Sequence, residues 1–150
     1  MSARQALAIQ RASRMKGIPP DAKLRAWARE AIRRPAQVTL RIVGEAEGRR
    51  LNRAYRGKDY ATNVLTFVYE SAPRASLAGD IVLCAPVLAR EAKAQGKTLE
   101  AHCAHLVVHG LLHLQGLDHE ADADAAAMER RERSILRRLG FADPYAAGSL

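Results

Sequence analysis

The sequence predicts a single α/β (α+β) domain over residues 1–150, with helices packed on a small mixed β-sheet. Segments of helical periodicity alternate with short segments rich in β-branched residues. A chain of 150 residues is typical of one domain, and its hydrophobic fraction of 48% can form a core without help from a disulfide or a metal. No internal repeat, low-complexity tract or linker interrupts this pattern.

The first part of the chain is expected to contain two strands and two helices. Pro20 and Asp21 open the first helix, and Pro35 ends it. Alternating apolar and polar residues from Val38 to Ile42 indicate a half-buried strand. In chain order, we predict a short strand at 6–9, a helix from 21 to about 33, a strand at 38–42 and a helix at 45–56.

The rest of the chain is expected to add two strands and three helices. Glycines that stop helices stand at Gly96, Gly116 and Gly140. In chain order, we predict a strand at 63–69, a loop at 71–78, a strand at 80–84, a helix from 86 to about 95, a buried helix from about 99 to 115 and an amphipathic helix from about 122 to 139.

The positive charge is concentrated in the first part of the chain. The net charge is +8, with 15 Lys/Arg against 5 Asp/Glu in residues 1–60 and 9 against 11 in residues 61–150. This asymmetry fits a polyanionic partner such as nucleic acid, and it equally fits a solvated basic surface.

No segment has the features of a signal peptide or of a membrane helix, so we expect a soluble, cytoplasmic protein without a membrane partner. Cys84 and Cys103 lie in apolar surroundings and are expected to be core residues rather than a disulfide.

A cluster of histidines predicts a metal site at the end of the buried helix. His109 and His113 are four residues apart, so their rings project from one helix face. Gly116 can take the left-handed conformation that turns the chain back and brings His119 to the same ion. This spacing, H-x3-H-x2-G-x2-H, is that of the metzincin zinc motif. His105 is expected to pack or to support a ligand rather than to bind the ion.

The motif lacks the general base of the zinc proteases. Gly110 stands where HExxH has its glutamate, which argues against proteolysis by that route. Three histidines would still leave an open coordination position and lower the pKa of a bound water towards ~7. Asp118 is the nearest carboxylate that could act as a base, and it could equally orient His119 or cap the turn.

A second segment, from Leu51 to Phe67, has the composition of a phosphate-binding surface. Arg53, Arg56 and Lys58 are candidate substrate-binding residues, because guanidinium groups bind phosphate through paired charged hydrogen bonds. Tyr55 and Tyr60 could stack on unpaired bases, although such mixtures also occur on solvated helix ends.

Together these segments resemble the YbeY family of bacterial endoribonucleases and rRNA maturation factors. The family motif HGxLHLxGyDH matches residues 109–119, its LNxxyRxkDxxTDVLSF-like segment matches 51–67, and its GDI strand matches 79–81. The C-terminal segment 140–145 also looks like the usual ending of the family. The resemblance extends from about Gln10 to Tyr145. Departures from the pattern are Leu117 for Tyr, Asn63 for Asp and Thr66 for Ser.

The resemblance implies a zincin-like fold and gives roles to individual residues. His109, His113 and His119 would hold one metal ion, and Arg56 would act in RNA binding or cleavage. The implied activity is metal-dependent, single-strand-specific cleavage of RNA in maturation of the small-subunit rRNA 3′ end and in ribosome quality control. The implied partners are the small ribosomal subunit, ribosomal proteins and an assembly GTPase.

Three functional hypotheses follow from the sequence. The first is metal-dependent endoribonuclease activity with Arg56 and Asp118 as catalytic residues and zinc as the metal, while nickel or another divalent transition metal would fit the same ligands. Either water or the RNA 2′-hydroxyl could be its nucleophile. The second is a ribosome-assembly factor that binds RNA and carries a structural metal. The third is a metalloenzyme with a different substrate, which leaves the basic bias unexplained.

Overall fold

The computed structural model describes residues 5–69, 77–116 and 122–146. These residues form a mixed α/β structure with a four-stranded sheet and five helices. The elements are β1 (Gln5–Arg11), α1 (Asp21–Ala31), β2 (Ala36–Val43), α2 (Glu45–Arg56), β3 (Val64–Val68), β4 (Leu77–Cys84), α3 (Ala85–Ala94), α4 (Leu99–Leu114) and α5 (Asp122–Arg138).

The strand order in the sheet is β1-β2-β4-β3. Strands β1, β2 and β4 run parallel, and β3 pairs antiparallel with β4. The predicted mixed sheet is therefore confirmed. Gly79 in β4 has no room for a side chain, because an added Cβ would lie 2.4 Å from the carbonyl oxygen of Phe67 in β3.

Most predicted elements are present, with differences at several of their ends. The strand predicted at 38–42 is observed as Ala36–Val43, and the one predicted at 63–69 as Val64–Val68. The first strand is longer than the predicted 6–9, because its pairing with β2 continues to Arg11. The first helix ends at Ala31 rather than near Arg33. Residues 77 and 78 were predicted as loop but belong to β4, where they pair with Ala36 and Gln37; the preceding residues 71–76 lie outside the described part.

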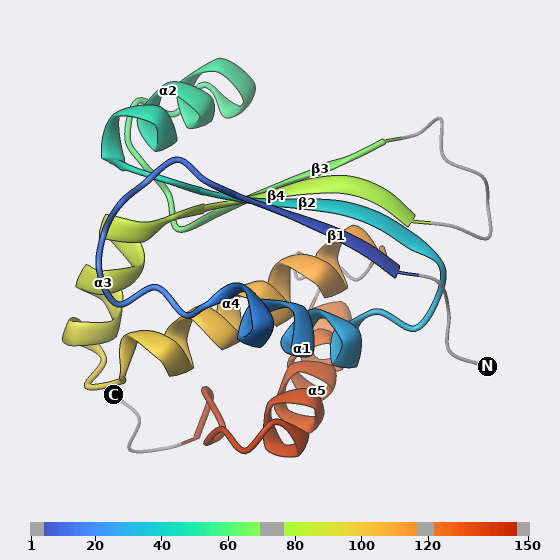
Figure 1. Ribbon diagram of the computed structural model, residues 1–150. Coiled ribbons are helices and arrows are strands. Elements are labelled where there is room, and N and C mark those ends of the chain that lie inside the picture. The colour runs from blue at the N-terminus through green and yellow to red at the C-terminus, as the bar shows by residue number, and fades with distance from the viewer. Residues whose placement is uncertain (1–4, 70–76, 117–121, 147–150) are drawn as a thin grey trace.

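Helices cover the two faces of the sheet unequally (Figure 1). Helices α1 and α4 lie against one face, and α5 packs against α4 on the side away from the sheet. The main core lies between this face and α4, and ten of the sixteen residues of α4 are buried. Helix α2 lies on the other face, above a smaller cluster formed by Val43, Leu65, Val82, Cys84 and Val87.

Both cysteines are buried and free, as the sequence analysis predicted. Burial raises the pKa of the Cys103 thiol to about 12, which keeps it protonated. None of the described helices is both long and apolar enough to span a bilayer.

Candidate metal centre

Helix α4 places two of the three predicted metal ligands, His109 and His113, in the lining of a cavity. Thr98 caps the helix by accepting a hydrogen bond from the amide of Ala101 at 3.1 Å. Eleven and fifteen residues further on, His109 and His113 are both half-buried and line a cavity of about 540 Å³. The structure therefore brings these two side chains to one cavity, as their spacing predicted.

Gly110 lets α4 pack closely on the sheet. A Cβ at this position would meet the side chain of Ile81 in β4 at 3.2 Å, and that of Val64 in β3 at 3.5 Å. Position 110 is therefore packed tightly against the sheet, next to Val64, which lines the cavity. A glutamate at this position would bring a charged side chain against the apolar side chains of Ile81 and Val64, which is unfavourable.

The end of α4 has the predicted geometry as far as it is described. Gly116 has φ +95°, in the left-handed region that ends helices and turns the chain. Asp118 and His119 come two and three residues later and lie outside the described residues. The third ligand and the proposed base therefore stay predictions.

A buried carboxylate from α5 contacts the histidines of α4. Glu132 is 0% exposed, and its Oε1 lies 2.6 Å from Nδ1 of His109. Its Oε2 lies 2.8 Å from Nε2 of His105 and accepts a 2.5 Å hydrogen bond from the hydroxyl of Tyr145. One carboxylate thus connects two turns of α4 with the segment that follows α5.

This network keeps Glu132 ionised. Burial raises the pKa of its carboxyl group, but the hydrogen bonds with His105, His109 and Tyr145 outweigh burial and bring the pKa to about 2. Burial, together with the hydrogen bond to Glu132, raises the pKa of the Tyr145 phenol, which therefore stays protonated as a donor. At neutral pH Glu132 consequently acts only as an acceptor.

The same three groups could in principle hold a metal ion themselves. The ligand atoms of His105, His109 and Glu132 lie within 4.8 Å of one another. However, two atoms bound to one tetrahedral zinc at ~2.0 Å would lie roughly 3.3 Å apart. The observed 2.6 and 2.8 Å separations are those of hydrogen bonds, so the present arrangement fits a carboxylate that supports histidines.

The end of α2 contributes a cation and an aromatic residue to the lining of the same cavity. Arg56 is the last residue of α2, which ends at Gly57 in a left-handed conformation, and Arg56 lines the cavity together with Tyr55. The Tyr55 ring packs edge-on against Phe67 in β3, with ring centroids 4.9 Å apart. Within the described residues, no carboxylate forms an ion pair with Arg56.

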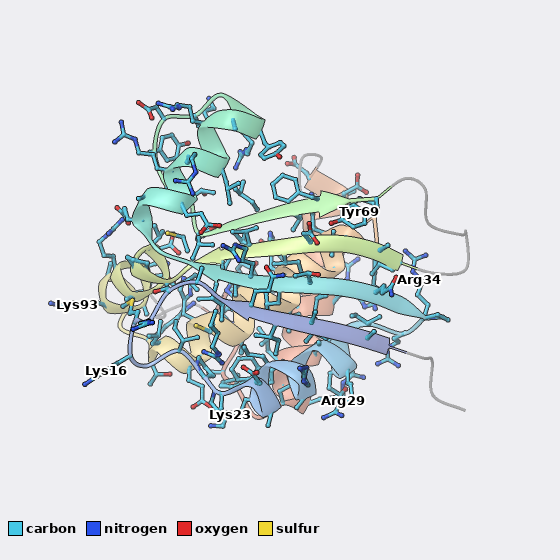
Figure 2. All side chains as sticks on the ribbon, turned by 45° about the horizontal axis from the view of Figure 1, so that its top comes forward. Lys16, Lys23, Arg29, Arg34, Tyr69 and Lys93 are labelled. Carbon is cyan, nitrogen blue, oxygen red and sulfur yellow. The ribbon has the colours of Figure 1, made fainter. Side chains whose placement is uncertain are left out.

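The two other predicted substrate-binding residues lie outside the cavity wall. Arg53 is exposed and lies 3.9 Å from the carboxylate of Asp59, which also pairs with Arg49. Lys58 is exposed on the turn after α2. Side chains of other basic residues are spread around the molecule rather than gathered at the cavity, as Figure 2 shows for Lys16, Lys23, Arg29, Arg34 and Lys93.

A second cavity of about 630 Å³ adjoins the first and shares Asn63, Val64 and His109 with it. At its wall the Asn63 amide donates to Glu91 at 3.1 Å, and the same carboxylate lies 2.9 Å from Nε2 of His102. The hydrogen bond with His102 lowers the pKa of Glu91 in spite of its partial burial. An amide at position 63 therefore avoids a contact between two carboxylates.

Sequence reasoning missed Glu132 and Tyr145. The sequence nevertheless held a signal for the first of them. Glu132 lies on the same stripe of α5 as the buried residues Met128 and Leu136, at the four-residue spacing where an apolar residue is expected. A lone acid on an apolar stripe has to be paired inside the protein. Tyr145 follows the last helix and gave no comparable signal.

Comparisons with known proteins match most of the chain. The family model for endoribonuclease YbeY matches residues 11–140. The endoribonuclease YbeY of Aromatoleum aromaticum is 60% identical over 149 residues, which cover 97% of this chain and 95% of that protein. That of Methylobacillus flagellatus is 54% identical over 144 residues, 96% of this chain and 95% of that protein. In a longer relative from Azoarcus sp., the match is 63% identical over 134 residues and spans 85% of this chain but 53% of that protein.

The fold is similar to a solved structure, the solution structure of TM1509 from Thermotoga maritima. The TM-score is 0.51 at 22% sequence identity, with 95% of this chain and 100% of the other covered. This likeness concerns the fold, and the helix with the histidines lies within the matched region of the family model.

Proposed function

The chain belongs to the YbeY family of endoribonucleases, and from this premise we propose that it is a metal-dependent hydrolase that cleaves single-stranded RNA at the cavity between α2 and α4. In this proposal His109, His113 and His119 hold one metal ion, with zinc as the first candidate and nickel as an alternative. The observation that carries the proposal is the cavity itself, which is lined both by two histidines of α4 and by Arg56 of α2.

The residues present fit a divalent transition metal. His109 and His113 offer imidazole nitrogens on successive turns of α4. The buried carboxylate of Glu132 contacts the ring of His109, as is usual for a metal-binding histidine. When bound, such a metal supplies Lewis acidity at the scissile phosphate.

The chain's own side chains bind and orient the substrate. The Arg56 guanidinium neutralises charge on the phosphate as it develops during cleavage, because it reaches the same cavity as the histidines and no described carboxylate competes for it. Asp118, two residues after Gly116, is proposed as the base or as the residue that orients His119. Arg53 and Lys58 attract the flanking phosphates from outside the cavity.

Specificity for single strands follows from the shape and composition of the cavity. Tyr55 is 67% exposed, and its ring forms part of the wall, where an unpaired base can stack on it. A duplex keeps its bases stacked on each other and cannot offer one to this ring. We therefore expect Tyr55 to contribute to substrate binding, while Tyr60 lies outside the lining.

The biological role proposed here is maturation of the 3′ end of small-subunit rRNA and ribosome quality control. Its partners would be the small ribosomal subunit, ribosomal proteins and an assembly GTPase, and it would act in the cytoplasm as one domain spanning residues 1–150. This part of the proposal rests on the family resemblance. The position of the Arg56 cation in the lining of the cavity and the basic excess in residues 1–60 support an RNA partner in general.

The proposal is tested by incubating zinc-loaded protein with matched single-stranded and duplex RNAs. The wild type should cleave only the single strand. Arg56→Ala should cleave it at least about 100-fold more slowly, which is the usual effect of losing one group that stabilises transition-state charge. Arg29→Ala is the matched control, because Arg29 lies on α1, across the sheet from α2 (Figure 1), and should leave the rate unchanged.

His113→Ala separates catalysis from binding. This variant should remain folded and bind RNA, yet lose cleavage together with the metal. Equal cleavage of both RNAs by all variants would contradict the proposed site. Full rRNA maturation by folded, RNA-binding His113→Ala protein would instead favour an assembly factor with a structural metal.

A further inference from the structure

We propose that Glu132 is a positioning residue for His109: its carboxylate holds the imidazole so that Nε2, rather than Nδ1, is presented to the metal. The inference rests on the proposed function in one respect, since it takes His109 as a metal ligand. It adds a residue from a different helix to the site and assigns a chemical state to the His109 ring.

The geometry defines which nitrogen carries the proton. Oε1 of Glu132 lies 2.6 Å from Nδ1 of His109, and a carboxylate can only accept, so Nδ1 must donate. In a neutral imidazole the lone pair then resides on Nε2, across the ring from Glu132. His109 also lines the cavity that contains His113 and Arg56, whereas Glu132 does not line it.

The carboxylate is itself held in place from two other directions. Oε2 lies 2.8 Å from Nε2 of His105, one turn before His109 on α4, and accepts a hydrogen bond from Tyr145 at 2.5 Å. Glu132 is completely buried, so water does not compete for these contacts. With both oxygens engaged, the carboxylate cannot rotate away from His109 without breaking the contacts on its other oxygen.

A purely structural role does not account for the arrangement as well. A buried carboxylate within the apolar stripe of α5 lowers the stability of the fold, and an apolar residue at this position would pack better. A carboxylate behind a ligating histidine fixes the ring's tautomer and orientation and increases its basicity. That function requires the contact with Nδ1 that is observed.

The direct test is the zinc affinity of two variants, one without and one with a hydrogen-bond acceptor for His109 at position 132. Glu132→Met removes the acceptor, and we expect zinc to bind about 100-fold more weakly. Glu132→Gln keeps one oxygen: its amide can donate to His105 and Tyr145 and direct its oxygen to His109. This variant should therefore lose only about tenfold, within the 10- to 100-fold range typical of such supporting groups.

The control is Glu91→Gln, which alters the other carboxylate–histidine contact of α4. Glu91 contacts His102 at 2.9 Å, and His102 does not line the cavity of His109 and His113. Its zinc affinity should stay within about twofold of the wild type. Melting curves recorded without metal verify that each variant is folded before zinc is added.

A second measurement does not depend on the metal at all. In the metal-free wild type, ¹⁵N NMR of the histidine side chains should show His109 protonated at Nδ1. In Glu132→Met, the proton should move to Nε2 or distribute over both nitrogens, while Glu132→Gln should retain the wild-type tautomer. A folded Glu132→Met variant with wild-type zinc affinity and an unchanged tautomer would overturn the inference.

Failure of this inference is distinguishable from failure of the proposed function. If the wild type binds no metal yet shows the Nδ1-protonated ring, the metal site is wrong while the positioning contact stands. If zinc binds through His113 but is indifferent to Glu132, the metal site stands and the positioning role is wrong. Loss of all zinc binding in Glu132→Gln, with zinc on Nδ1 in the wild type, would make Glu132 a ligand and refute the inference.

Discussion

At the scale of single residues, the residue directly after His109 is the place where this site differs from the HExxH zinc proteases, which have their general base there. In HExxH sequences a glutamate follows the first histidine. Here Gly110 takes that position and faces Ile81, with 3.2 Å between the Ile81 side chain and the place of a Cβ. The carboxylate nearest to His109 in the described residues comes instead from Glu132, on another helix.

Restoring the missing glutamate should therefore damage the fold instead of creating a protease. Gly110→Glu would bury an unpaired carboxylate against β4, and we expect a loss of about 3–5 kcal/mol in the free energy of unfolding. Urea denaturation measures this loss. Ala126→Glu, at an exposed position of α5, is the control and should change stability by less than about 0.5 kcal/mol. A stable Gly110→Glu protein would contradict the packing described for α4.

At the scale of elements, periodicity and helix-ending residues predicted most of the secondary structure. The helix expected at 45–56 is observed as Glu45–Arg56, because an amphipathic pattern and Gly57 define it locally. The ends of β1 and β4 were not predictable in the same way. Their lengths are decided by pairing with β2, a strand that is distant in sequence.

We expect the turn after α4 to have a function that a stability measurement alone would not reveal. Gly116 and Gly96 both have positive φ values, +95° and +67°, and open space where a Cβ would lie. Replacing either with alanine should cost about 1–2 kcal/mol in stability through backbone strain. Only Gly116→Ala should also weaken zinc binding, because the chain leads from this residue to His119.

Thermal unfolding without metal, followed by zinc titration, separates the two effects. Equal zinc affinity for Gly116→Ala and Gly96→Ala would argue against the predicted return of His119 to the site. Weaker zinc binding by Gly116→Ala alone, at matched stability, is the result we expect.

At the scale of the whole molecule, the site depends on contacts that no local pattern contains. The spacing of His109 and His113 predicted their shared cavity, since both lie on one helix. The sequence also suggested Arg56, but only the sheet order β1-β2-β4-β3 brings the end of α2 to the same cavity. Arg53 shows the limit of this reasoning, because it lies on the same helix and pairs with Asp59 instead.

Glu132 was missed for a related reason. Its charge fits the polar composition of α5, and only the packing of α5 on α4 shows that it contacts His105 and His109. Pairing between helices is set by the tertiary fold, so a buried acid is visible in sequence only as a break in an apolar stripe.

The central claim is that a metal is held by ring nitrogens of His109, His113 and His119. The most direct test is NMR of ¹⁵N-histidine-labelled protein loaded with ¹¹³Cd, which reveals each metal-bound nitrogen through its coupling to cadmium. We predict coupling to Nε2 of His109 and to one ring nitrogen each of His113 and His119, with none to His105. Coupling to Nδ1 of His109 and to His105, without His113, would place the metal at the Glu132 cluster and contradict the account.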